Sequence, residues 1–266
     1  MAGDAELSEA DGVITVTFTR DAKLNAVSDE MLEVLWAAAT ALGDREDLRV
    51  MVITARGRHF TAGRDIQTMG GWADGPPRGK ALRRDYRRLH LLFDEFEAIE
   101  KPVVLAAQGP CRGIGIEMAA SCDFRLAAQS ATFSLPEVVN LAVIPGSGGI
   151  SRLTRLVGPH WARWLALACQ TVGAEQSVTI GLCHAVFPDE SFVADVEAFA
   201  RSLAALPAQA VGLAKLAIDA AASADRVTAR DFDRLANSLL ITSDEHADRV
   251  AAFNARRQPR PPDATT

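Results

Sequence analysis

The hydrophobic pattern of the first half of the chain switches repeatedly between strand and helix periods. Residues 13–18 alternate apolar and polar side chains, which is typical of a half-buried strand. Ser28 has the character of a helix N-cap, and apolar residues recur at helical spacing from Leu32 to Leu42. Apolar runs at 50–54 and 103–107 predict buried strands, separated by an amphipathic helix over 81–99.

Helical spacing dominates the second half. Residues 124–127, 132–133 and 185–187 predict three more short strands. The pattern predicts helices over 162–168, 193–206, 208–222 and 232–253. Alternating strands and helices, followed by helices alone, predict an α/β domain with a helical C-terminal region. We expect the Pro-rich tail, 258–266, to be disordered and the Gly/Pro/Trp segment at 70–79 to be a mobile loop.

The composition argues against several classes of protein. The 266 residues are 48% hydrophobic and 23% charged, as in ordinary globular proteins. The net charge of −6 and the lack of a dense Lys/Arg block argue against nucleic acid or an anionic membrane as a partner. No apolar run approaches the ~20 residues of a membrane helix. Residues 1–11 lack a signal-peptide pattern, so we expect a cytoplasmic protein.

The cysteine and histidine patterns predict no metal site. Four cysteines occur without a Cys-x-x-Cys pair, and we expect them to be reduced thiols. Five histidines show no spacing that suggests metal ligands.

Two glycine-rich turns follow two of the predicted strands. The turn at 60–65 follows the strand at 50–54, and the turn at 109–117 follows the strand at 103–107. Such turns let backbone N–H groups approach a ligand, and a carboxylate beside them can move protons near a developing anion. Glu117, in the second turn, and Glu137, after a proline, are the candidate carboxylates.

Structural roles are an alternative for each of these acidic residues. Glu117 in a first helical turn also favours the helix dipole, Glu137 can be a solvated loop acid, and Asp65 is expected to cap a helix start. Sequence spacing does not make the two turns neighbours. The residues by themselves therefore leave both acid–base chemistry and plain structural roles open.

A series of short motifs resembles the enoyl-CoA hydratase/isomerase (crotonase) family. Residues 24–27 are similar to its Asn-Ala-Leu segment, 60–66 to its Ala-Gly-x-Asp loop, and 108–123 to its Asn-Gly-x-x-x-Gly-Gly-Gly-x-Glu turn and helix. Residues 133–137 and 144–149 resemble Phe-Gly-x-Pro-Glu and Ile-Pro-Gly-x-Gly-Gly. The segments 152–158 and 174–182 fit the following helices, and 250–259 resembles the closing motif. Each motif is weak alone, but their order extends over nearly the whole chain.

The resemblance implies an α/β fold, a crotonase-like spiral of ββα units with a C-terminal helical trimerisation region. It implies a spiral core with the acyl-CoA site in 1–200, an oligomerisation region in 201–258 and a tail in 259–266. It also implies self-association as trimers or hexamers.

The same resemblance implies a site for an acyl-CoA thioester. The family's two glutamates, which hold one water against the β-carbon, match Glu117 and Glu137. Its two oxyanion-hole N–H groups match those of Arg64 and Ile114. The implied substrate and CoA contacts are Lys23, Leu24, Ala26, Ala62, Gly63, Asp65, Ile66, Gly113 and Trp72. Coenzyme A would be part of the substrate, so we expect no separate cofactor and no metal.

Retention of both glutamates favours a hydratase that adds water to a trans-2-enoyl-CoA. An isomerase that uses mainly Glu137 is the chief alternative, followed by a thioester hydrolase and by a non-catalytic acyl-CoA- or RNA-binding scaffold. The chain departs from the family pattern at Ile114, where glycine is usual, at Gln108, where asparagine is usual, and at Arg112. The directions of the Arg64 and Arg112 side chains stay open.

Overall fold

The structure is a computed structural model that describes residues 3–67 and 79–257. The chain divides into two compact units, Met1–Ala205 and Leu206–Thr266. Trp72, nearly all of the segment 70–79 and the tail lie outside the described residues, so the expectations for them stay predictions.

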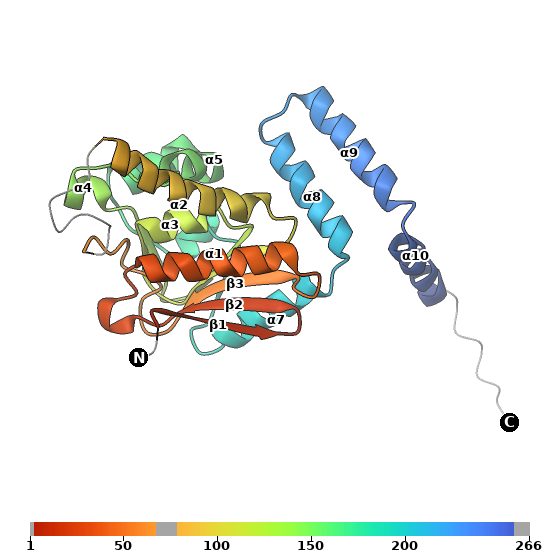
Figure 1. The fold of residues 1–266 in the computed structure, drawn as a ribbon, viewed down its shortest axis with the longest axis horizontal. Helices are drawn as coiled ribbons and strands as arrows, with labels where there is room; N and C mark the ends of the chain where they lie inside the picture. The colour runs from red at the N-terminus through yellow and green to blue at the C-terminus, as the bar shows by residue number, and fades with distance from the viewer. Residues whose placement is uncertain (1–2, 68–78, 258–266) are drawn as a thin grey trace. The chain divides into compact units, whose positions relative to one another are not determined.

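A six-stranded sheet forms the centre of the first unit (Figure 1). Its strand order is β1-β2-β3-β4-β6-β9; β1 pairs antiparallel with β2, and the other pairs are parallel. The strands are β1 Ala5–Ala10, β2 Val13–Phe18, β3 Val50–Ala55, β4 Val103–Ala107, β6 Phe124–Ala128 and β9 Ala185–Phe187. The apolar pattern predicted all of these strands except β1.

The sequence analysis did not predict β1, because the residues of this strand show no clear pattern of apolar positions. Five of its six residues are exposed, and only Ala5 is buried. The strand forms by backbone pairing with β2, in a register that places Leu7 opposite Val16. A pairing of this kind depends on the neighbouring strand, so periodicity within the segment does not report it.

A second, three-stranded sheet has the order β5-β7-β8. Its strands are β5 Cys111–Arg112, β7 Thr132–Ser134 and β8 Val172–Gly173. Strands β5 and β8 are further strands that the sequence did not predict, since two residues are too few for a pattern. Strand β5 ends immediately before Gly113, so this small sheet fixes where the second glycine turn begins.

Helices cover both faces of the large sheet. Figure 1 shows α1 (Asp29–Asp44) and α2 (Lys80–Ala98) on one side and α7 (Phe192–Ala204) on the other. The Ser28 hydroxyl accepts a hydrogen bond from the N–H of Met31 at 3.3 Å, which confirms the predicted N-cap. Each face has its own cluster of buried apolar side chains, so the sheet is a layer between two cores.

Short helices connect the strands of the first unit. They are η1 Asp21–Lys23, α3 Ile114–Ala119, α4 Glu137–Leu141, α5 Gly149–Ala162, η3 Arg163–Leu167 and α6 Ala174–Thr179. Helix α5 is interrupted at Gly158, whose φ of 72° is non-helical. Helix α3 begins in the second glycine turn, and α4 begins after Pro136; each carries one of the two candidate glutamates in its first turn.

The second unit consists of the helices α8 Ala208–Ala221, α9 Arg226–Leu240 and α10 Asp244–Arg257. The single helix predicted over 232–253 is therefore wrong: the chain breaks at 241–243. The Ser243 hydroxyl accepts a hydrogen bond from the N–H of His246 at 3.2 Å, and two acidic residues follow it, which is an N-terminal signal for a new helix. Helix α9 begins earlier than predicted because Asp225 caps it at the N–H groups of Val227 and Thr228.

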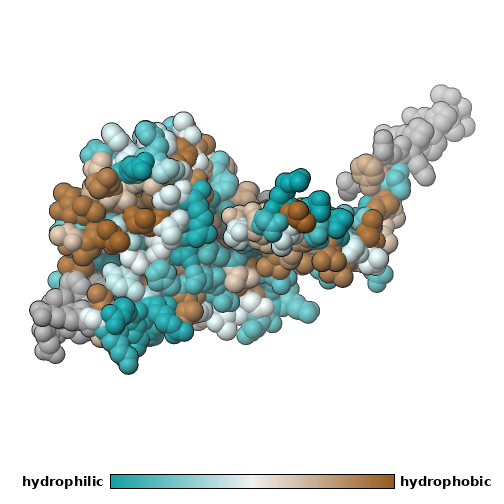
Figure 2. Space-filling model, turned by 90° about the horizontal axis from the view of Figure 1, so that it is seen from above, coloured by the Kyte–Doolittle hydropathy of each residue, from teal (hydrophilic) through white to brown (hydrophobic). Residues whose placement is uncertain are grey.

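Hydrophobic side chains remain exposed on both units. Figure 2 shows hydrophobic surface on the first unit and along the helices of the second. In the first unit it includes Val139 and Ile144, at and after α4, and in the second Leu235, Leu239 and Phe253. Among the described residues no single helix is long and apolar enough to cross a membrane; only α7 and α8 together, across a bend, reach that length and composition.

Candidate active site

The two glycine turns, more than forty residues apart in the sequence, lie side by side. Thr61 forms a parallel bridge with Cys111: its N–H donates to Pro110 O at 3.1 Å, and its carbonyl accepts from the N–H of Arg112 at 3.1 Å. A Cβ added to Gly113 would lie 3.6 Å from the Cα of Gly63. The structure thus supplies the proximity that the sequence spacing left open.

Two amide side chains, the buried Asn25 and the partly buried Gln108, hold the first turn in place. The Nδ2 of Asn25 donates to the carbonyls of Arg56 and His59 at 2.8 and 2.7 Å, and the Nε2 of Gln108 donates to the same His59 carbonyl at 2.9 Å. The Thr61 hydroxyl donates in turn to the Asn25 carbonyl at 2.7 Å. Gln108, one of the departures from the family pattern, therefore connects the end of β4 to His59, the residue just before the first glycine turn.

The backbone N–H groups of Arg64 and Ile114 donate to no acceptor among the described residues. Arg64 forms a parallel bridge with Val27, in which the flanking Gly63 carbonyl and Asp65 N–H make the two hydrogen bonds, at 2.8 and 2.9 Å. The bridge leaves the N–H of Arg64 itself unused. Ile114 is the first residue of α3, where a helix has no internal acceptor for the N–H.

The side chain of Arg64 points toward the start of α1. Its Nη1 donates to the Val27 carbonyl at 2.6 Å, and its Nη2 is paired with Asp29 in the first turn of α1. The structure therefore settles the direction that the sequence left open. The other arginine in question, Arg112, is exposed.

The segments predicted to contact coenzyme A form two hydrogen-bonded loops. The N–H of Ala62 donates to the Leu24 carbonyl at 2.9 Å. Arg20 reaches both loops, because its Nη1 donates to the Ala26 carbonyl at 2.9 Å and to Asp65 Oδ2 at 2.6 Å. Lys23, at the end of η1, and Gly63 lie in the same two loops, and Ile66, just beyond, is 42% exposed.

The predicted cap role of Asp65 stays a prediction, because residues 68–78 lie outside the described residues. Its Oδ2 pairs with Arg20, and its Oδ1 accepts a hydrogen bond from the N–H of Gln67 at 2.9 Å. The carboxylate fixes the first glycine turn to the loop that contains Ala26.

Glu117 is buried on α3, with 3% of its surface exposed. Its Oε1 accepts a hydrogen bond from the N–H of Ser147 at 3.0 Å. Burial raises the pKa of the Glu117 carboxyl, and the hydrogen bonds from Ser147 and Gly149 oppose this in part. A Cβ on Gly149 would lie 2.8 Å from Glu117 Oε1, so glycine is needed at this position for the carboxyl to fit.

Glu137 lies at the start of α4 and faces the second turn. A Cβ on Gly113, whose φ is 56°, would lie 2.7 Å from Glu137 Oε1. Burial, aided by the negative charge of Glu117, raises the pKa of Glu137 from 4.5 to about 7. Its Oε2 is buried and has no hydrogen-bond partner among the described residues. Glu137 is thus an acid poised near neutrality beside the N–H groups of Arg64 and Ile114.

A cavity of about 570 Å³ lies near the two glutamates, although neither of them lines it. It lies between α2, with Tyr86 and His90, and the loop that carries Val143 and Gly146. Burial and, to a smaller extent, the charges of Glu117 and Glu137 raise the pKa of Tyr86, so both carboxyls lie within electrostatic reach of this wall. The sequence analysis missed Tyr86, His90 and Ser147. Helical spacing identifies α2 only as an amphipathic helix, and no pattern in the sequence shows that His90 contacts Gly146 or that Ser147 binds Glu117.

A buried arginine positions the loop that binds Glu117. Arg152 of α5 is 8% exposed; its Nη1 donates to the Ser147 carbonyl at 3.3 Å. Its Nε donates to Glu97 at 2.8 Å, and its Nη2 pairs with Asp94 and Glu97, both on α2. Since the N–H of Ser147 holds Glu117, the network connects α2, α5 and the candidate catalytic carboxyl.

Replacing Arg152 by methionine is expected to lower kcat by about tenfold or more, because the Ser147 loop loses its anchor and the Glu117 carboxyl its orientation. The apparent pKa values of the rate profile should shift upward as well, since a loosened Ser147 N–H stabilises the carboxylate less. Arg155→Met, an exposed arginine on the same helix, is the control. A reduced melting temperature with an unchanged pH profile would show that Arg152 is purely structural.

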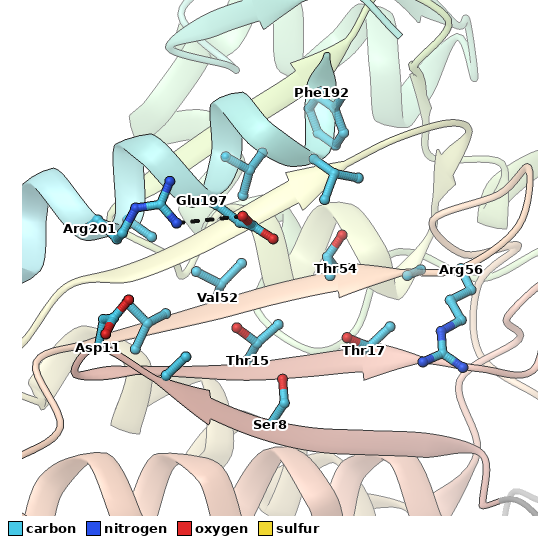
Figure 3. A pocket seen from close by; sticks show the side chains of 16 residues that line it. Ser8, Asp11, Thr15, Thr17, Val52, Thr54, Arg56, Phe192, Glu197 and Arg201 are labelled. Carbon is cyan, nitrogen blue, oxygen red and sulfur yellow. Dashed lines mark hydrogen bonds and ion pairs between the residues drawn. The ribbon is translucent and has the colours of Figure 1, made fainter. Parts of the chain in front are cut away.

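A second cavity, of about 470 Å³, lies on the opposite face of the sheet and contains none of the predicted site residues. Figure 3 shows its floor of hydroxyl side chains, among them Thr15, Thr17 and Thr54, below α7, where Arg201 pairs with Glu197. No group of three or more potential metal ligands occurs in the described ranges 3–67 and 79–257.

Comparison with known proteins places the chain in a family. The enoyl-CoA hydratase/isomerase family model matches residues 8–262. A short-chain-enoyl-CoA hydratase of Clostridium acetobutylicum is 33% identical over 249 residues, 92% of each chain. A 1,2-epoxyphenylacetyl-CoA isomerase of Escherichia coli is 32% identical over 94% of each chain. The crystal structure of an enoyl-CoA hydratase from Bacillus anthracis superposes with a TM-score of 0.88 at 28% identity, covering 97% of this chain and 98% of that one. The chain belongs to the enoyl-CoA hydratase/isomerase family.

Proposed function

We propose that this protein hydrates a trans-2-enoyl-CoA. The observation that carries the proposal is the convergence of two glutamates, the buried Glu117 and the partly buried Glu137, on the turn whose Ile114 N–H, like the neighbouring Arg64 N–H, has no acceptor among the described residues. The related hydratase of Clostridium acetobutylicum supports it.

The two N–H groups would bind the thioester carbonyl oxygen of the substrate. When water attacks the β-carbon, the electrons of the carbon–carbon double bond move toward this oxygen, and the negative charge that develops there is stabilised by preorganised donors. Each such donor is worth roughly 10²–10³ in rate. Neither donor needs to be freed from another hydrogen bond to a described residue, so the site is arranged before substrate binds.

The two carboxyls would manage the protons of the reaction. One carboxylate takes a proton from the water as its oxygen bonds to the β-carbon, and a carboxyl returns a proton to the α-carbon, which completes the hydration. The charge of Glu117 acts on Glu137, so the two carboxyls titrate as a coupled pair, and the pair can hold one proton near pH 7. Proton transfer of this kind contributes about 10²–10⁴ in rate.

The direct test is the loss of absorbance of the conjugated enoyl thioester when the protein is mixed with crotonyl-CoA, with identification of 3-hydroxybutyryl-CoA as the product. Formation of that product supports hydration. Release of free coenzyme A, which requires cleavage of the thioester bond, would contradict hydration and support thioester hydrolysis.

Double-bond isomerisation is the second candidate. Glu137 alone, with a pKa of about 7 and a buried oxygen that no described residue hydrogen-bonds, has the properties of a single acid that carries a proton between two carbons. The related isomerase of Escherichia coli supports keeping this alternative. A 3-enoyl-CoA substrate separates the two, since an isomerase converts it to the conjugated 2-enoyl product without adding water.

The raised pKa of Glu137 predicts a pH dependence of stability. Its folded-state value, about 7, exceeds the ordinary 4.5, so the folded protein binds more protons than the unfolded chain between these values. The contribution of Glu137 to the unfolding free energy should therefore fall as pH rises from about 4.5 to about 7. Denaturant unfolding across this range should show wild type losing stability relative to Glu137→Gln. The raised pKa would be contradicted if the unfolding free energy of wild type stayed constant relative to that of Glu137→Gln, or increased relative to it, as pH rises.

We also propose that the protein self-associates as a trimer or hexamer. The support is the exposed apolar surface of the second unit, where Leu235 is 67%, Leu239 62% and Phe253 58% exposed. Light scattering at micromolar concentration is expected to give three or six times the mass of 28.4 kDa. Leu235→Glu with Leu239→Glu should shift the mass toward the monomer; a stable wild-type monomer would contradict the proposal.

A further inference from the structure

The cavity beside the two glutamates has a cationic wall. Arg83 and Arg87 of α2 line it, four residues apart and so on the same face of the helix. Both side chains are exposed, and neither forms an ion pair with a residue in 3–67 or 79–257. The next arginines on the helix differ: Arg84 pairs with Asp85, and Arg88 does not line the cavity.

The inner end of this cavity is the end nearest the reacting groups. Tyr86 and His90 form it together with Gly146, where an added Cβ would lie 2.4 Å from the Tyr86 ring. The Nε2 of His90 lies 3.0 Å from the Gly146 carbonyl. Gly146 directly precedes Ser147, whose N–H binds Glu117. A chain leaving the glutamates through the cavity would therefore pass His90 and Tyr86 before it reached the arginines.

The wall opposite α2 is apolar. Val143 and Ile144 line it and are 47% and 65% exposed, values that an acyl chain in the cavity would reduce. Leu82 of α2 adds another apolar contact at the outer end. The cavity therefore combines an apolar passage with two positive charges at its far end that form no ion pair with a described residue, an arrangement suited to a hydrocarbon chain that ends in an anion.

We propose, building on the hydratase function above, that the preferred substrates are enoyl-CoA thioesters whose acyl chain ends in a carboxylate, bound by Arg87 and Arg83. Arg87 lies three residues and Arg83 seven residues before His90, which is about 5 and 10 Å along a helix. An extended carbon chain advances about 1.2 Å per bond. About four bonds beyond the level of His90 therefore reach the level of Arg87, and about eight bonds reach Arg83.

The experiment compares kcat/KM for 2-enoyl-CoA pairs of equal chain length, about six, eight and ten carbons, that end in a carboxylate or in a methyl group. The wild-type protein should prefer the carboxylate form by about fivefold or more, and added salt should reduce this preference. Arg87→Gln should lower the ratio most for the shortest pair, and Arg83→Gln most for the longer pairs. Arg88→Gln, on the same helix but outside the cavity, should leave every ratio unchanged.

Equal or better rates with the methyl-terminated chains, or equal effects of Arg88→Gln and Arg87→Gln, would overturn the proposal. Calorimetric binding of the saturated carboxylate- and methyl-ended acyl-CoA compounds tests it without catalysis. If no enoyl-CoA is hydrated but the carboxylate-ended compound binds more tightly and needs Arg83 or Arg87, the hydratase function fails and the ligand preference stands. If crotonyl-CoA is hydrated without any binding preference, the ligand preference fails and the hydratase function stands.

Discussion

Replacement of Glu117 or Glu137 by glutamine is expected to reduce turnover of crotonyl-CoA by at least about two orders of magnitude each, with little change in the binding of CoA. An amide has the shape of the carboxyl but no useful basicity. The Ser147 N–H can still donate to the amide oxygen at position 117, so the loop around the site should persist. The measurement is kcat and KM for both variants, with thermal unfolding to establish that the fold is intact.

Glu175→Gln is the matched control for these two variants. Glu175 lies, like Glu117, in the first turn of a short helix, but it is exposed on α6 and outside the cavity beside the glutamates. Wild-type hydration in Glu117→Gln would disprove the paired-acid mechanism. A large loss in Glu137→Gln alone would favour the isomerase instead.

Replacement of Ile114 by proline is expected to lower kcat on the order of 10² or more, because proline removes the N–H proposed to bind the thioester oxygen. The position tolerates proline structurally better than most, since it is the first residue of α3 and no helix hydrogen bond is lost there. The preceding residue is Gly113, whose freedom of backbone angles limits the constraint that proline places on its neighbour. Circular dichroism checks that the fold survives.

Ile114→Gly separates the N–H from the side chain. It keeps the donor, so turnover of short enoyl thioesters should stay within about tenfold of wild type. The Ile114 side chain is 4% exposed and belongs to the core, so this variant should lose roughly 2–5 kcal/mol of stability, and the assay temperature must lie well below its melting temperature. Equal, mild effects of proline and glycine on turnover would mean that this N–H does not bind the thioester oxygen.

The outline of the fold was accessible from the sequence because its signals are local. Alternation in β2, the apolar runs of β3 and β4, and the Ser28 cap of α1 are properties of a few consecutive residues. Where the signal was weak or divided, the prediction failed. Strand β1 has one buried residue, and the N-cap of α10 at Ser243 lies within a stretch whose apolar spacing is otherwise helical throughout.

The features of the candidate site also divide into local ones and contacts between distant segments. The sequence by itself determined that two glycine turns and two glutamates are present, and the order of its short motifs identified the family. Both are local properties, because a glycine turn and a short motif each depend on a few consecutive residues. Only the tertiary structure decided that Thr61 pairs with Cys111 and that Ser147 binds Glu117 across thirty residues. It also decided that the Arg64 side chain turns to α1 and that α2 lines the cavity. These are contacts between distant segments, fixed by how the sheet and its helices pack and not by any local preference, so no pattern within one segment could contain them.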